Sequence, residues 1–197
     1  MSRGVECHFS KRSFAKHEPC ADLGLILKNK QGLFFAIADV AGHGDAAHRL
    51  SLKIRKYFVN NHKDDLIDLM SNLHIFLKGS RGAVAAAGSL DRKTGAIEYV
   101  GLGNITARKI GKKDTRFISN EGVIGYVIPT PTIRRFRLGA GDVFLLHTDG
   151  IHDHFQARDC PKYFFDQDAK RIANGIVKYF HRGDDDAGCI AIRYKNG

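Results

Sequence analysis

The chain has 197 residues, of which 43% are hydrophobic and 26% charged, a composition that excludes an intrinsically disordered protein. No run reaches the roughly 18 apolar residues of a membrane helix, and residues 1–10 lack the apolar core of a secretory signal. The net charge of +10 would suit nucleic acid, but the basic residues are spread along the chain outside any nucleic-acid-binding motif. We therefore expect one cytoplasmic domain over residues 1–197, with neither nucleic acid nor a membrane as partner.

The first part of the chain predicts strands followed by two helices. Apolar patterns predict strands over Val5–Phe9, Leu23–Leu27 and Leu33–Ala38, and the last two have turn chemistry between them, as in a hairpin. From Asp45 the apolar residues recur at helical spacing. A second helix is predicted over Asp64–Leu77, with the aspartate as its N-cap.

The second part of the chain predicts mostly strands separated by short turns. The predicted strands are Ala83–Leu90, Ala96–Gly101, Asn104–Ile110, Thr132–Leu138 and Asp142–His147. A last helix over Asp166–His181 and a strand over Gly188–Tyr194 follow. Because runs of strands are grouped apart from runs of helices, the sequence favours an α+β sandwich of sheet and helix layers over a doubly wound α/β sheet.

Several aspartates stand at the ends of predicted strands. Asp39 follows one strand, Asp149 follows another and precedes a glycine, Asp184–Asp186 precede the last strand, and Asp22 precedes the strand at Leu23. Each alone is explained as a turn-former or cap. If the strand ends converge, the carboxylates would repel one another unless a divalent cation neutralised them, and oxygen ligands suit magnesium or manganese. The pattern therefore suggests metal-assisted hydrolysis.

Three segments resemble the SpoIIE-type serine/threonine phosphatases, bacterial members of the metal-dependent PPM class. Asp39–Gly44 is similar to the start of the family signature DVxGHG..A. Leu138–Ile151 is similar to L..GD.lLLyTDG, and Asp185–Arg193 resembles DDaTvvvvR. Gly103-Asn104 falls where the family has a Gly-Asn strand start. The order and spacing of these segments match over nearly the whole chain.

The resemblance implies a four-layer αββα sandwich, two antiparallel sheets flanked by helices, with two Mn²⁺ or Mg²⁺ ions at one end of the sheets. Asp39 would bridge both ions, and the Val40 carbonyl would bind one of them. Asp149 and Asp185 would hold the other ion, and Asp22 would act through metal-bound water. Asp39 and Asp149 are in this sense candidate catalytic residues.

The resemblance also implies the reaction and the partner. A metal-activated water would hydrolyse phosphoserine or phosphothreonine on a regulatory protein. The segments Arg81–Ala83 and Gly122–Tyr126, with no sensor or receiver domain in the sequence, point to a stand-alone phosphatase of stressosome pathways. The expected partner is a phosphorylated stressosome-type sensor or scaffold protein.

Three points stay open at the level of sequence. His43 is a candidate general acid for the leaving oxygen or a hydrogen-bonded structural residue. Because three aspartates are consecutive, Asp184, Asp185 or Asp186 could be the last metal ligand, with Asp185 favoured by the family register. Gly188 stands where the family usually has Thr, a change near the second metal that removes no ligand.

Two other functions compete with this reading. A phosphatase fold that has lost turnover could dock a regulatory protein through its basic residues, although retention of the aspartates speaks against that alternative. The pair His152-Asp153 is typical of HD-type phosphohydrolases. That class is all helical, so the strand leading into Asp149 argues against it.

Overall fold

The computed structural model describes residues 4–152, 155 and 159–195, so Asp153 of the His-Asp pair lies outside the described residues. In chain order the elements are β1 (Val5–Arg12), β2 (Leu23–Lys28), β3 (Gly32–Val40), α1 (Gly44–Asn61), α2 (Leu66–Phe76), β4 (Ala83–Asp91), β5 (Ala96–Leu102), β6 (Thr106–Ile110), β7 (Thr115–Phe117), β8 (Arg134–Arg137), β9 (Val143–His147), a 3₁₀ helix (Phe164–Asp166), α3 (Ala169–Phe180) and β10 (Ala187–Tyr194).

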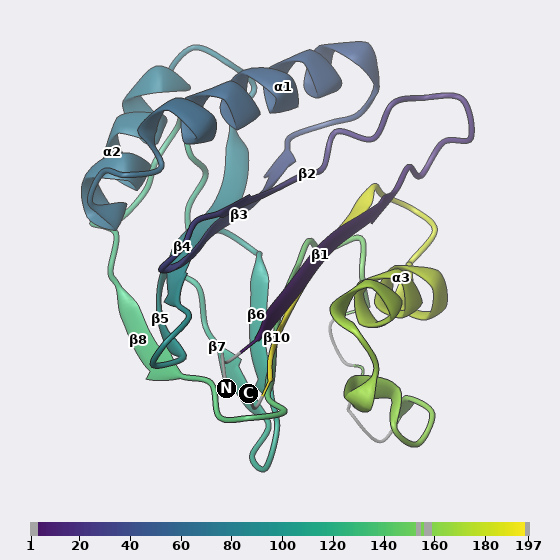
Figure 1. The fold of residues 1–197 in the computed structure, drawn as a ribbon. Helices are drawn as coiled ribbons and strands as arrows, with labels where there is room; N and C mark the ends of the chain where they lie inside the picture. Colours follow the sequence, from purple (N-terminus) through teal and green to yellow (C-terminus); the bar gives the residue numbers. More distant parts are fainter. Residues whose placement is uncertain (1–3, 153–154, 156–158, 196–197) are drawn as a thin grey trace.

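Two five-stranded antiparallel sheets form the centre of the fold. Sheet A has the order β1-β10-β9-β6-β7, and sheet B has the order β2-β3-β4-β5-β8. Helices α1 and α2 cover sheet B, whereas α3 lies against β1 and β10 of sheet A, so the layers run helix, sheet, sheet, helix (Figure 1). The expected four-layer αββα sandwich is confirmed.

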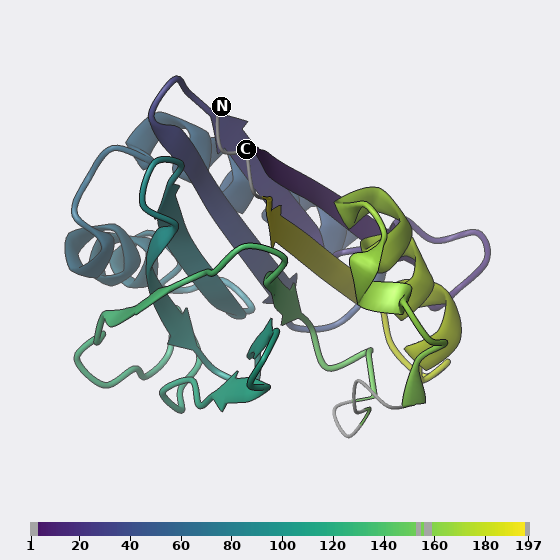
Figure 2. The same cartoon turned by 60° about the horizontal axis from the view of Figure 1, so that its bottom comes forward.

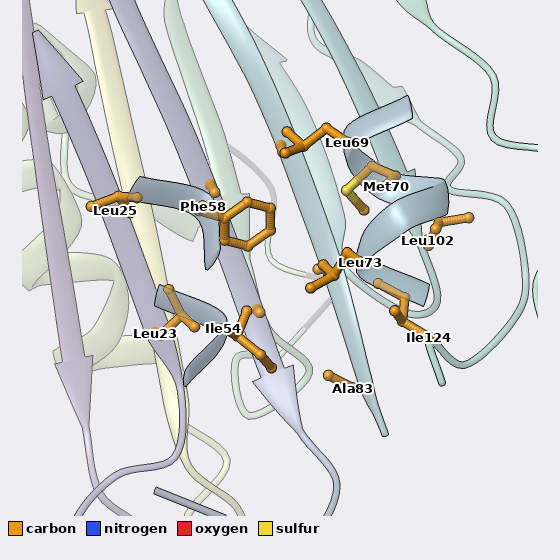
Figure 3. Close-up of a cluster of buried hydrophobic side chains, with 14 of the residues drawn as sticks. Leu23, Leu25, Ile54, Phe58, Leu69, Met70, Leu73, Ala83, Leu102 and Ile124 are labelled. Atoms are coloured by element: carbon orange, nitrogen blue, oxygen red, sulfur yellow. The ribbon is translucent and has the colours of Figure 1, made fainter. Parts of the chain in front are cut away.

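Three apolar clusters hold the four layers together. The first lies between the α1–α2 layer and sheet B, where Phe58 and Met70 face Leu25 and Leu102 of the strands (Figure 3). The second lies between the sheets and includes Phe35 and Phe144, whose ring centroids are 5.8 Å apart, and the third lies under α3. β3 is buried at nearly every position because both of its faces lie against apolar layers.

The predicted elements match the observed ones with few exceptions. β7 has only three residues, which is too short for alternation to predict it. Helix α2 is capped by Asp65, whose Oδ1 accepts a hydrogen bond from Ile67 N at 2.8 Å, so the expected cap at Asp64 is wrong by one residue. Helix α3 begins at Ala169 after the cap Asp168, because the preceding turn is a separate 3₁₀ helix.

β1 joins the beginning of the chain to its end. It pairs with β10 from Val5–Tyr194 to Arg12–Ala187, and α3 packs across both strands (Figure 2). The ring of Phe9 fills a space between the sheets that two glycines leave open. A Cβ on Gly24 would stand 2.1 Å from this ring, and one on Gly188 would stand 3.2 Å from it.

Candidate active site

The strand ends bring four aspartates from four segments to one end of the sandwich. Asp22 precedes β2 and lies opposite the end of β3, where Asp39 is located, because Leu23 pairs with Ala38. Asp149 follows β9, and Asp185 precedes β10, the antiparallel neighbour of β9. Beyond the effect of burial, the charges of Asp149 and Asp185 raise the pKa values of Asp22 and Asp39, and the charge of Asp149 raises that of Asp185, so the four side chains lie within electrostatic range.

The Asp22 side chain is fully buried, and only one of its two carboxylate oxygens has a hydrogen bond among the described residues. Its Oδ2 accepts a hydrogen bond from the Thr148 hydroxyl at 2.7 Å, whereas Oδ1 has no hydrogen-bond partner among the described residues. Burial raises the pKa of Asp22 to about 7, with further contributions from Asp186, Asp185 and Asp149, while the Thr148 hydrogen bond opposes the rise. A buried carboxylate with an unsatisfied oxygen is suited to a positive partner.

Asp39 is half-buried and is the second-last residue of β3, next to the buried Val40 that ends the strand. Burial, followed by the charges of Asp22 and Asp149, raises the pKa of Asp39 to about 9. The loop that follows contains Gly42 and Gly44 at φ +83° and +76°, values that only glycine adopts without strain. This loop explains the spacing of the signature, because it reverses the chain directly into α1.

Asp149 is oriented by an asparagine from another strand. Its Oδ2 accepts a hydrogen bond from Nδ2 of Asn104 at 2.8 Å, and its Oδ1 has no hydrogen-bond partner among the described residues. Asn104 stands just before β6, which pairs with β9, so the two side chains meet at the same sheet edge. The asparagine thereby fixes one carboxylate oxygen and leaves the other for a ligand.

The three consecutive aspartates have three different surroundings. Asp184 is exposed, and its Oδ2 accepts from Arg182 Nη2 at 3.0 Å. Asp186 is buried and accepts hydrogen bonds from the backbone N–H groups of Phe14 at 2.9 Å and Ala21 at 2.6 Å, which ties down the segment after β1. Asp185 is exposed toward solvent, yet partial burial and the charge of Asp149 raise its pKa. These surroundings favour Asp185 as the ligand, and its assignment stays a prediction.

His43 is the N-cap residue of α1, and its side chain lies between Glu18 and Phe14. Its Nδ1 is 2.9 Å from Oε2 of Glu18, and the ring contacts Phe14 edge to face at a centroid distance of 6.0 Å. The His43 side chain is 65% exposed and makes no side-chain cap on the helix. Its role as a general acid stays a prediction, and the partner Glu18 had no sequence signal.

The aspartate cluster fits divalent cations by its chemistry. All of the donors are hard oxygens, and two of the buried carboxylate oxygens lack hydrogen bonds among the described residues. Burial and mutual repulsion raise the pKa values of Asp22 and Asp39, an effect that bound cations would reverse. Among the described residues, no three Asp, Glu, His or Cys side chains already form a complete ligand set. The aspartates are thus close enough for electrostatic coupling, and their chemistry fits divalent cations.

The close neighbours of Gly188 account for the glycine at a position where the family pattern has Thr. A Cβ on Gly188 would be 3.2 Å from Oδ2 of Asp22 and 3.2 Å from the Phe9 ring. Its backbone N–H also donates to the Thr148 hydroxyl at 2.8 Å. The glycine thus allows Asp22, Phe9 and Thr148 to approach the start of β10 closely.

A cleft of about 730 Å³ begins at Asp149, and we call it the Asp149 cleft. It is lined by residues 103–106, 116–119, Asp149, Ile151, His152 and Arg182. Sequence reasoning missed this cleft because its walls come from four separate parts of the chain. It also missed Thr148 and Asn104 as orienting residues, although both stand inside the quoted family motifs.

Comparison with known protein families decides the class of the chain. Residues 29–195 match the family of Stage II sporulation protein E (SpoIIE). The chain belongs to the SpoIIE family. This SpoIIE-family chain is accordingly a protein serine/threonine phosphatase of the metal-dependent PPM class, as the sequence motifs predicted. Comparison with curated proteins gives no match.

Solved structures have the same fold as this SpoIIE-family chain. One solved chain is described with "The bacterial stressosome: a modular system that has been adapted to control secondary messenger signaling". It is 26% identical to this chain, with a TM-score of 0.85. The match covers 96% of this chain and 100% of that one. RsbX in complex with magnesium is 18% identical, with a TM-score of 0.81 and coverage of 97% and 96%. The PP2C phosphatase domain of SpoIIE from Bacillus subtilis, with a fragment of its regulatory domain, is 16% identical, with a TM-score of 0.81 and coverage of 100% and 64%.

Within the described part of the chain, no helix is both long and apolar enough to cross a bilayer.

Proposed function

We propose that the chain removes phosphate from phosphoserine or phosphothreonine of a stressosome-type sensor or scaffold protein, using two Mn²⁺ or Mg²⁺ ions. The family membership supports the reaction class. The likeness to a chain described with the bacterial stressosome, and to RsbX, supports the kind of partner. The observation that carries the proposal is the meeting of four aspartates, two of which keep an unsatisfied buried oxygen.

In this proposal five residues hold the ions. Asp39, the Val40 carbonyl, Asp149 and Asp185 would hold them directly, and Asp22 would act through metal-bound water. When bound, such a pair of cations lowers the pKa of coordinated water and offsets the charge that develops on the phosphoryl group. The electrostatic cost of bringing the aspartates together supports this assignment, because cations remove that cost.

Side chains around the aspartates hold them in position. Asn104 fixes one oxygen of Asp149, and Thr148 fixes one oxygen of Asp22, so each carboxylate presents its second oxygen to an ion. Hydrogen bonds of this kind orient ligands and tune their affinity for a metal. Because Thr148 is buried and bonded to the start of β10, this orientation is coupled to the packing of sheet A.

His43 is the candidate that would protonate the leaving serine or threonine oxygen. Glu18 occupies Nδ1, which leaves Nε2 as the nitrogen that can deliver a proton. A histidine with a carboxylate partner on one nitrogen is a common general acid, because the partner stabilises the protonated ring. The exposure of His43 is compatible with access by a protein substrate.

A direct test uses the purified protein with a phosphorylated stressosome sensor or scaffold protein and, separately, a phosphoserine peptide. Release of phosphate should depend on Mn²⁺ or Mg²⁺ and stop on chelation. Binding of the phosphorylated protein without release of phosphate, with either metal present, would instead support the binding module without turnover. Hydrolysis of the peptide but not of these proteins would refute the partner and keep the reaction.

A further inference from the structure

The Asp149 cleft adjoins the aspartate cluster at Asp149, and most of its lining residues have no role in the proposed metal site. Of the described residues, only Asp149 belongs to both the cluster and the lining of the cleft. The volume of about 730 Å³ is in the range of clefts that bind small ligands or short peptide segments. A substrate whose phosphate is at the aspartates would therefore have neighbouring groups within reach of the cleft.

The charged lining of the cleft is mostly basic. Arg116 and Arg182 contribute two permanent positive charges, and His152 adds a group that can become positive. Among the described residues that line the cleft, the one carboxylate is Asp149, which the proposed function assigns to a metal ion. The electrostatics of the cleft therefore favour an acidic occupant, in line with the net charge of +10.

Arg182 lines the cleft and is held there by hydrogen bonds that leave some of its N–H groups for a ligand. Its Nη2 donates to Asp184 Oδ2 at 3.0 Å, and its Nη1 lies 3.4 Å from the carbonyl oxygen of Asp149. These two contacts use two of the five N–H groups of a guanidinium. The remaining groups can bind a carboxylate in the forked geometry that distinguishes arginine from lysine.

Apolar residues lie next to these charges. The side chain of Ile118 is 79% exposed, and Phe117 beside it is half-buried. A single exposed isoleucine needs no explanation by itself, but this one forms part of a cleft wall that also carries arginine. A surface with both features fits a peptide segment with an acidic and an apolar side chain better than it fits a free inorganic anion.

We propose that the Asp149 cleft binds the substrate segment next to the phosphorylated serine or threonine and selects an acidic residue there through Arg182. The inference rests on the proposed function, because it needs the phosphate at the aspartate cluster. It adds a substrate class, phosphoproteins with acidic residues beside the phosphorylated site. It also gives Arg182 the role of a specificity-determining residue.

The test compares three phosphoserine peptides that share a common sequence. One has glutamates before the phosphoserine, one has them after it, and one has glutamine at all these positions. With Mn²⁺, kcat/KM should be about 5- to 10-fold higher for one glutamate peptide than for the glutamine peptide, mostly through KM, as expected for an exposed charge-assisted contact. R182Q should abolish this preference.

Two further variants keep the test specific. Arg171 is also exposed but pairs with Asp168 on α3, outside the cleft, so R171Q should keep the wild-type preference. I118S should lower kcat/KM for glutamate and glutamine peptides alike, because it removes apolar contact without changing charge. Since each result is a ratio between peptides, a general effect of R182Q on Asp149 cancels.

The outcomes separate the two proposals. If the wild-type protein hydrolyses the glutamate and glutamine peptides equally, or if R182Q keeps the preference, the cleft proposal is wrong and the proposed function stands. If no phosphopeptide releases phosphate with either metal, the proposed function itself fails.

Discussion

The Thr148 hydroxyl donates a hydrogen bond to Asp22 Oδ2 at 2.7 Å, joining residues 126 positions apart in the sequence. The same hydroxyl accepts from the Gly188 N–H, so one buried side chain connects β2, β9 and β10. Asp22 has no other described side-chain donor, and its orientation depends on this contact. The site is thus defined by residues behind the carboxylates as well as by the carboxylates themselves.

T148V tests this relationship. The substitution keeps the shape but removes the hydroxyl, so Asp22 loses its hydrogen bond and the Gly188 N–H is left unsatisfied. Manganese affinity or turnover should fall about 10- to 100-fold, the usual effect of losing a group that orients a metal ligand. Metal titration of phosphatase activity measures it. T94V removes a surface hydroxyl that bonds Asp91 and should behave as wild type.

Asp39 should be indispensable for turnover and unfavourable for stability without metal. In D39N we expect activity to fall by at least about 100-fold, because a proposed bridging ligand loses its charge. The metal-free variant should melt at a higher temperature than the metal-free wild type, since burial and repulsion disfavour the Asp39 carboxylate. Wild-type rates for D39N with manganese would refute the two-metal assignment.

The consecutive aspartates can be separated by two matched variants. D185N should require at least about 10-fold more manganese for half-maximal activity, because an amide cannot offset cation charge. D184N should stay within about a few-fold of wild type on a small phosphate ester, because Asp184 is exposed and paired with Arg182. If D184N is the variant that needs more metal, the register of the last motif is wrong by one residue.

The metal-free protein should lose stability as the pH rises. The pKa values of about 7 for Asp22 and about 9 for Asp39 exceed the ordinary value of 3.8, so between these limits the folded state binds more protons than the unfolded state. Unfolding free energy therefore falls from about pH 4 to pH 9. Denaturant titrations in chelator should show this fall, with a smaller slope in D39N. A metal-free stability that increases over this range would contradict the pKa directions.

The order of strands and helices could be predicted because apolar alternation and helical spacing are properties of short windows. The four aspartates could be predicted to converge only through the family motifs. The contact of His43 with Glu18 could not, because it joins a helix start to a loop without regular pattern. Nor could the Asp149 cleft, whose walls come together only when β6, β7 and the segment after β9 pack in three dimensions. β7 is only three residues long and is a strand because it pairs with β6.

The pairing of β1 with β10 sets the time at which the protein can become active during its synthesis. Each residue of β1 pairs with a residue about 180 positions further along the chain, from Val5 with Tyr194 to Arg12 with Ala187. At about 5 to 20 residues per second, the ribosome takes roughly ten to forty seconds to supply those partners. Asp185 and β10, the strand that connects β1 to β9, are synthesised directly one after the other. A growing chain therefore has neither a complete sheet A nor a complete aspartate cluster until β10 has been synthesised.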